Sequence, residues 1–171
     1  MPNLRKCLLL PILTALLLTL VGCTGGSMGL LGGSLTLSSA GARGLAQQVF
    51  DLTQAERRDA GRAELTWNDQ LAQAAQAHAD DMSRRDYFAH ESPEGGTVGD
   101  RTTQAGYDWA WIGENIAAGQ TSAEQVMQEW MGSPGHKKNI LFNEFTEMGV
   151  AVSANGAGRL YWVQVFGKPR S

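Results

Sequence analysis

The chain has 171 residues and is mildly acidic, with 17 acidic against 14 basic side chains and a formal net charge of −3. This length is sufficient for one domain with a buried core. The basic residues form no stripe along the sequence, which argues against nucleic acid as a partner. Only two cysteines are present, so a framework of several disulfides is excluded.

An export signal is predicted at the N-terminus. A short basic start is followed by an apolar run from residue 8 to 21, which is too short to span a bilayer comfortably. The run ends in Leu-Val-Gly and then Cys23, a pattern that resembles the lipobox of bacterial lipoproteins. The resemblance implies a signal peptide over residues 1–22 and a lipid on the Cys23 sulfur. The alternative is a plain secretory signal with an incidental cysteine.

Lipidation would leave the exported domain without a free cysteine. Cys7 leaves with the signal and Cys23 is blocked, so neither is available for a disulfide, a nucleophile or a zinc–thiolate site. Residues 23–44 are rich in Gly, Ser, Thr and Leu with almost no charge, which is typical of a flexible tether. The expected location is therefore the cell envelope, on its periplasmic or extracellular face, with the membrane contacted through the lipid anchor.

The folded domain is predicted to cover residues 45–168. A first helix is indicated by Leu45, Val49 and Leu52 at helical spacing, and Gly61 stops it. A second helix follows, with Asn68 as its N-cap. His78 lies on the apolar face of that second helix, where a packed histidine with one hydrogen-bond partner is favoured over a ligand.

The middle of the domain carries the most informative single residue. A short helix is predicted over 97–106, with Asp100 and Arg101 exposed, and an apolar strand follows over 112–118. Glu114 lies inside that strand between apolar neighbours. A carboxylate in such a position is costly to bury unless another group pairs with it.

The last third predicts two helices and two strands. A helix over 123–131 is followed by a short one in which Ser133 is the N-cap and a proline occupies the first turn. His136 then falls in that first turn, where the helix dipole disfavours the imidazolium form. The strands, over 147–153 and 159–166, are apolar on both faces, so helices should cover both sides of the sheet.

Several motifs follow one another in a fixed order along residues 45–167. They are His90-x-Ser92-Pro93, Arg101, Gly113-Glu114-Asn115-Ile116, Trp130-Met131-x-Ser133-Pro134-Gly135-His136, Asn139-Ile140, and Tyr161-Trp162-Val163-Gln164-Val165-Phe166-Gly167. This set of motifs resembles the CAP superfamily of cysteine-rich secretory, antigen 5 and pathogenesis-related 1 proteins, in its bacterial SCP-like branch. The resemblance implies an α-β-α sandwich with a small antiparallel sheet.

The resemblance also implies a cleft, and it places His90, Glu114 and His136 on three of the four cleft positions of the family. Ser133 stands where the remaining glutamate is usual. Two imidazoles and one carboxylate form a ligand set that zinc accepts with a water. The alternative is a hydrogen-bond network that fixes the surrounding loops. Ser133, His136 and Glu114 together also suggest the catalytic residues of a hydrolase. Ser133 is better explained as a helix cap, so no catalytic residue is assigned.

Two functions follow from these residues and the resemblance. The favoured one is a non-enzymatic binding module of the cell envelope, whose cleft or aromatic surface takes a lipid, a glycan or a protein. The alternative is a metal-dependent hydrolase or protease that acts on envelope components.

Overall fold

The computed structural model describes residues 37–171. The predicted signal peptide, Cys23 and most of the predicted tether lie outside these residues. Within the described part of the chain, no helix combines the length and the apolar character needed to cross a membrane.

The described chain forms a mixed α/β fold with one four-stranded sheet in the order β1-β3-β4-β2. Strand β4 pairs antiparallel with both β2 and β3, whereas the short β1 adds to β3 in parallel. The sequence did not predict β1, because two residues are too few to show a strand pattern. The elements are α1 (Ser39–Asp59), β1 (Thr66–Trp67), α2 (Asp69–Arg85), α3 (Val98–Gln104), β2 (Trp109–Ala118), α4 (Ala123–Gly132), α5 (Pro134–Ile140), β3 (Glu147–Ala154) and β4 (Leu160–Pro169).

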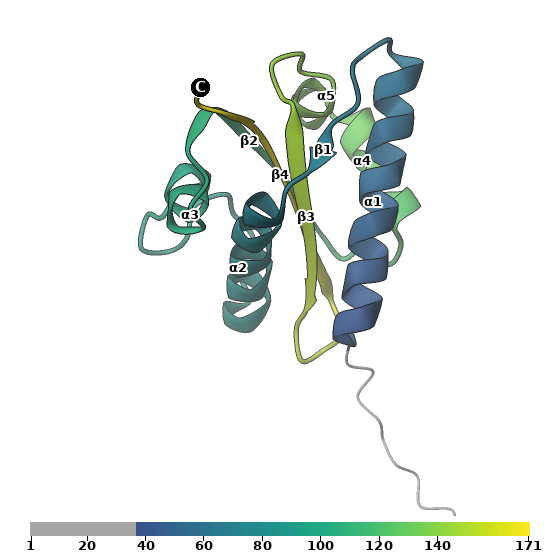
Figure 1. Ribbon diagram of the computed structural model, residues 1–171. Coiled ribbons are helices and arrows are strands. Elements are labelled where there is room, and N and C mark those ends of the chain that lie inside the picture. Colours follow the sequence, from purple (N-terminus) through teal and green to yellow (C-terminus); the bar gives the residue numbers. More distant parts are fainter. Residues whose placement is uncertain (1–36) are drawn as a thin grey trace, which may run out of the picture. The chain divides into compact units, whose positions relative to one another are not determined.

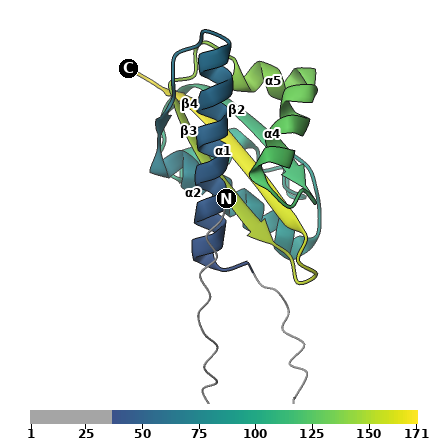
Figure 2. The ribbon, with the colours of Figure 1, turned by 90° about the vertical axis from the view of Figure 1, so that its right-hand side faces the viewer.

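Helices cover both faces of the sheet, as the apolar strands predict. Helix α2 packs on one face, and α1 packs on the other with α4 and α5 beside it (Figures 1 and 2). Each face has its own buried cluster, and alternate strand residues contribute to the two: Val150 and Val152 to the α1 side, Ala151 to the α2 side. Both clusters lie between residues 37 and 166, so this stretch carries its own hydrophobic core.

Helix α1 begins earlier than expected. The first helix was expected from Leu45, but it begins at Ser39, and the Ser38 hydroxyl accepts the backbone N–H of Gly41 at 3.1 Å. The sequence did not predict this first turn because it contains Gly41 and Gly44, and glycine disfavours a helix interior. The cap and the apolar stripe that continues from Leu45 outweigh that preference.

Helix α2 begins as predicted and lies very close to the sheet. Asn68 caps it by accepting the backbone N–H groups of Gln70 and Leu71. In β3, a Cβ on Gly149 would lie 2.0 Å from the backbone nitrogen of Ala72, so only glycine permits this approach. The close contact fixes the position of α2, and with it that of His78.

The outer edge of β2 is joined to the two short helices by side chains. The indole Nε1 of Trp130 in α4 donates to the carbonyl of Ile116 at 3.1 Å. The amide Nδ2 of Asn139 in α5 donates to the carbonyl of Glu114 at 3.0 Å. These bonds hold α4 and α5 in fixed positions beside the strand that carries Glu114.

Candidate functional site

Glu114 is buried, with 6% of its surface exposed, and its carboxylate is fully paired. Its Oε1 lies 2.8 Å from Nδ1 of His90, and its Oε2 accepts Nη2 of Arg101 at 2.8 Å. The Nε2 atom of His78 is 3.9 Å from Oε1. The strand pattern predicted that this carboxylate would need partners, and the structure identifies them.

Arg101 belongs to the site, although the sequence analysis gave it no role there. It was expected to be exposed, but only 11% of its side chain is accessible. Besides Glu114, its guanidinium donates to the carbonyls of His90 at 2.9 Å and Gly96 at 3.1 Å. Arg101 therefore ties the loop between α2 and α3, which carries His90, to the carboxylate of β2.

His78 is packed as predicted, with 1% of its surface exposed and its Nε2 2.9 Å from the carbonyl of Ala89. Its place beside Glu114 was not foreseen. Burial lowers the pKa of His78, and the nearby Glu114 charge opposes this shift only in part. The buried imidazole of His78 is thus held in its neutral form beside the Glu114 carboxylate.

Of the three side chains around the Glu114 carboxylate, which are His78, His90 and Arg101, His90 is the exposed one. Helix α2 ends at Arg85, and its C-cap Asp86 has a left-handed backbone (φ 52°) that stops the helix four residues before His90. The His90 side chain is 55% exposed while Nδ1 contacts the carboxylate. A histidine whose Nδ1–H is held by a carboxylate presents the lone pair of Nε2 outward.

His136 lies in the first turn of α5, the helix whose Asn139 binds β2. Helix α5 begins at Pro134, with Ser133 as the N-cap as predicted, but the Ser133 hydroxyl makes no capping hydrogen bond. The pKa of His136 is lowered first by burial and then by the nearby charge of His90. Its buried Nδ1 has no hydrogen-bond partner among the described residues.

Asn115 explains why α5 presents His136 at this place. Its Nδ2 donates to the backbone carbonyl of His136 at 3.2 Å and to Oε1 of Gln164 at 3.1 Å. Its Oδ1 accepts Nδ2 of Asn139 at 2.9 Å. Because Asn115 and Glu114 are neighbours on one strand, they point to opposite faces, and each positions one histidine.

A hollow of about 280 Å³ opens beside His136. Its walls are mostly apolar, and the exposed ring of Phe88 stands at its rim. Ser133 and His136 line this hollow, whereas His90 and Glu114 do not. The four residues of the predicted cleft therefore divide into a His90–Glu114 pair and a Ser133–His136 wall, and no hydrogen bond within residues 37–171 joins the two.

These side chains do not fit a three-ligand metal site. Within residues 37–171, no group of three His, Cys, Asp or Glu side chains is arranged to hold a metal ion. Both Glu114 oxygens are engaged, so Glu114 orients His90 rather than offering itself as a ligand. Two imidazoles remain, one fewer than the three protein ligands usual at a catalytic zinc. Zinc binding through His90 and His136 stays a prediction.

Comparison with known proteins agrees with this architecture. The model of the cysteine-rich secretory protein family (CAP) matches residues 50–166. The uncharacterized protein YkwD of Bacillus subtilis is 39% identical over 120 residues, 70% of this chain and 46% of that protein. The uncharacterized membrane protein YlbC of the same organism is 34% identical over 120 residues, 70% of this chain and 33% of that protein. The chain thus spans less than half the length of these curated relatives.

Solved structures show the same fold. An extracellular protein with an SCP domain from Bacillus anthracis is 37% identical with a TM-score of 0.70, over 75% of this chain and 41% of that one. An outer surface protein of Borrelia burgdorferi, 19% identical, has a TM-score of 0.68 over 72% of this chain and 92% of its own. The latter likeness supports the fold alone. Because the family model covers more than half of the sequence, from α1 to β4, this chain belongs to the cysteine-rich secretory protein (CAP) family.

Proposed function

We propose that this chain is a lipid-anchored CAP-domain protein of the bacterial cell envelope that binds its ligand without cleaving it. The paired carboxylate carries this proposal. A general base must be free to take a proton from the reacting group. Glu114 is instead engaged by Arg101 on one oxygen and by His90 on the other, and its side chain is 2% exposed.

The residues around His136 favour binding for a second reason. A serine nucleophile needs a base within hydrogen-bond reach. No hydrogen bond joins Ser133 to His136 in residues 37–171, and Ser133 occupies the N-cap of α5. The hollow beside them combines apolar walls with a few polar groups, which is the composition of a ligand site.

The envelope location rests on the N-terminal sequence and on the relatives. The lipobox-like ending at Cys23 supports a lipid anchor. The relatives include a protein described as extracellular and another described as a membrane protein. Export to the envelope accords with both, and it brings the domain to lipids, glycans and proteins outside the cytoplasm.

A metal-dependent hydrolase is the second candidate, and one observation favours it. The contact between His90 Nδ1 and Glu114 leaves His90 Nε2 directed outward, as in histidines that bind zinc, and burial keeps His136 neutral. Calorimetric titration of zinc into wild-type, His90→Ala and His136→Ala proteins tests this. One-to-one binding lost in both variants would support a metal site; binding unaffected by either would exclude this pair.

The binding proposal is tested with the chain from Leu37 onward. The protein is incubated with purified peptidoglycan, and separately with a soluble fatty acid, in the presence of zinc or of a chelator. We expect one of the two to be bound, with no soluble fragments released from the peptidoglycan. His136→Ala and Phe88→Ala should weaken this binding, while Gln128→Ala, on the exposed side of α4, should leave it unchanged.

Two results would contradict the proposal. Fragment release that stops on addition of chelator would establish the hydrolase instead. Binding that neither substitution affects would place the ligand away from the hollow beside His136.

A further inference from the structure

A second buried charge, Arg57, belongs to α1, on the face of the sheet opposite α2. The side chain of Arg57 in α1 is fully buried and donates to three carbonyls: Ala63 at 2.7 Å, Ile140 at 2.7 Å and Phe142 at 3.1 Å. None of the ion pairs within residues 37–171 includes it. Burial and the nearby charge of Arg62 lower the pKa of this guanidinium, but an arginine stays charged. A buried cation without a counter-ion among the described residues is thus fixed by three carbonyl groups.

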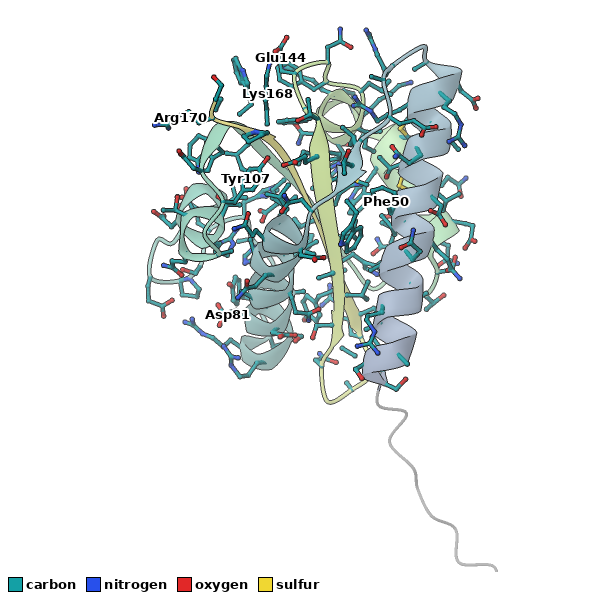
Figure 3. All side chains as sticks on the ribbon, viewed as in Figure 1. Phe50, Asp81, Tyr107, Glu144, Lys168 and Arg170 are labelled. Carbon is teal, nitrogen blue, oxygen red and sulfur yellow. The ribbon has the colours of Figure 1, made fainter. Side chains whose placement is uncertain are left out.

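A hollow of about 430 Å³ adjoins this cation, because Phe142, whose carbonyl Arg57 binds, is part of its lining. Arg62 and Lys138 line it as well, both exposed, and neither forms an ion pair within residues 37–171. Its one acidic residue, Glu144, is neutralised by Lys168 at 2.7 Å (Figure 3). The hollow is therefore positive, although residues 37–171 carry more acidic than basic side chains.

Aromatic side chains adjoin the same hollow. Phe142 packs edge to face against Trp111, with ring centroids 5.6 Å apart. Trp111 is 49% exposed, one of only two large apolar side chains of the described residues to be so accessible. Tryptophan favours the boundary between hydrocarbon and water, and lysine and arginine favour anionic headgroups.

We propose that this surface, here called the basic aromatic patch (Arg62, Trp111, Lys138, Leu141 and Phe142), binds the phosphate headgroups of anionic phospholipids at a membrane. Arg62 and Lys138 contact a headgroup, the buried Arg57 adds its field, and Trp111 enters the interface. The proposal is independent of the Glu114 and His136 residues. A second copy of the chain is disfavoured as the occupant because two positive patches repel. A soluble polyanion would leave the exposed indole without a partner.

The test uses flotation of the chain from Leu37 onward with vesicles, which removes the contribution of any lipid anchor. Vesicles of phosphatidylglycerol mixed with phosphatidylcholine should bind the protein, and vesicles of phosphatidylcholine alone should not. Added salt should weaken binding. Lys138→Glu should reduce the partition coefficient at least about tenfold, because each basic residue near such a surface contributes about 1 kcal/mol. Trp111→Ala should reduce it several-fold.

Arg43→Glu is the matched control. Arg43 is exposed, forms no ion pair within residues 37–171, and lies near the start of α1, at the end opposite α5 and the patch (Figure 1). This variant should bind as wild type does. Absence of binding to anionic vesicles, or equal weakening by Arg43→Glu, would overturn the proposal. So would displacement of the protein from vesicles by soluble polyglycerol phosphate at equal phosphate concentration. Thermal unfolding checks that each variant is folded.

Discussion

The two buried charges among residues 37–171, Glu114 and Arg57, are stabilised in different ways. Glu114, on the α2 side of the sheet, is matched by Arg101 and contacts His90. Arg57, on the α1 side, is held by three carbonyl dipoles and by no carboxylate of the described residues. A matched charge fixes loops and leaves little field outside, whereas an unmatched one imposes its sign on the nearby surface. The first arrangement suits a structural network, and the second suits attraction of an anion.

Removal of Arg57 should have the largest effect on stability. Arg57→Met leaves the carbonyls of Ala63, Ile140 and Phe142 without their donor, so we expect the free energy of unfolding to fall by about 3–5 kcal/mol. Urea denaturation measures this. Arg58→Met is the control, because the neighbouring Arg58 is exposed and paired only with Glu64, and it should change little. A gain in stability for Arg57→Met would mean that burial of the cation outweighs its hydrogen bonds.

Breaking the pair of Arg101 and Glu114 should lower the free energy of unfolding by a somewhat smaller amount. Arg101→Gln leaves Glu114 buried without its cation, and we expect a loss of about 3 kcal/mol. The double variant Arg101→Gln/Glu114→Gln should lose less than the two single variants together, with a coupling of about 2 kcal/mol. Urea denaturation of all four proteins gives this coupling. Strictly additive losses would show that the two side chains do not depend on each other.

Acidification should have the smallest effect on the free energy of unfolding. The pKa values of His78 and His136 are lowered in the folded state, so the unfolded chain binds more protons near pH 6. Their contribution is complete above the ordinary histidine pKa of about 6.5 and is lost as the pH falls toward the folded values. We expect stability to drop by about 1 kcal/mol between pH 7 and 5.5. His136→Gln should reduce that slope; a slope unchanged in this variant would exclude His136 as a source.

The sequence predicted those features that depend on neighbouring residues. Asn68 was recognised as a cap because its contacts, to Gln70 and Leu71, lie within one turn. The start of α5 at Pro134 follows from the same kind of local signal. The last two strands are apolar on both faces, which predicted helices on both sides of the sheet, since each strand residue must pack against one side or the other.

The site was predicted only in part, because its contacts join distant segments. In the sequence, Arg101 looks like any polar residue of a short helix. Its contact with Glu114 forms only because the fold places α3 beside β2. Arg57 resembles an exposed helix residue, and its carbonyl partners at 140 and 142 lie more than 80 residues away. His78 was placed correctly as a packed residue, but its distance to Glu114 depends on how closely α2 approaches the sheet.

The side-chain bonds at the outer edge of β2 have a consequence for copies of this domain held at high local density. An edge strand with free carbonyls is a template on which another chain can add a strand, and such addition leads to aggregation. Trp130 and Asn139 occupy the carbonyls of Ile116 and Glu114, and the helices that carry them stand beside the strand. The contacts that position the site thus also protect this part of the edge against intermolecular strand pairing.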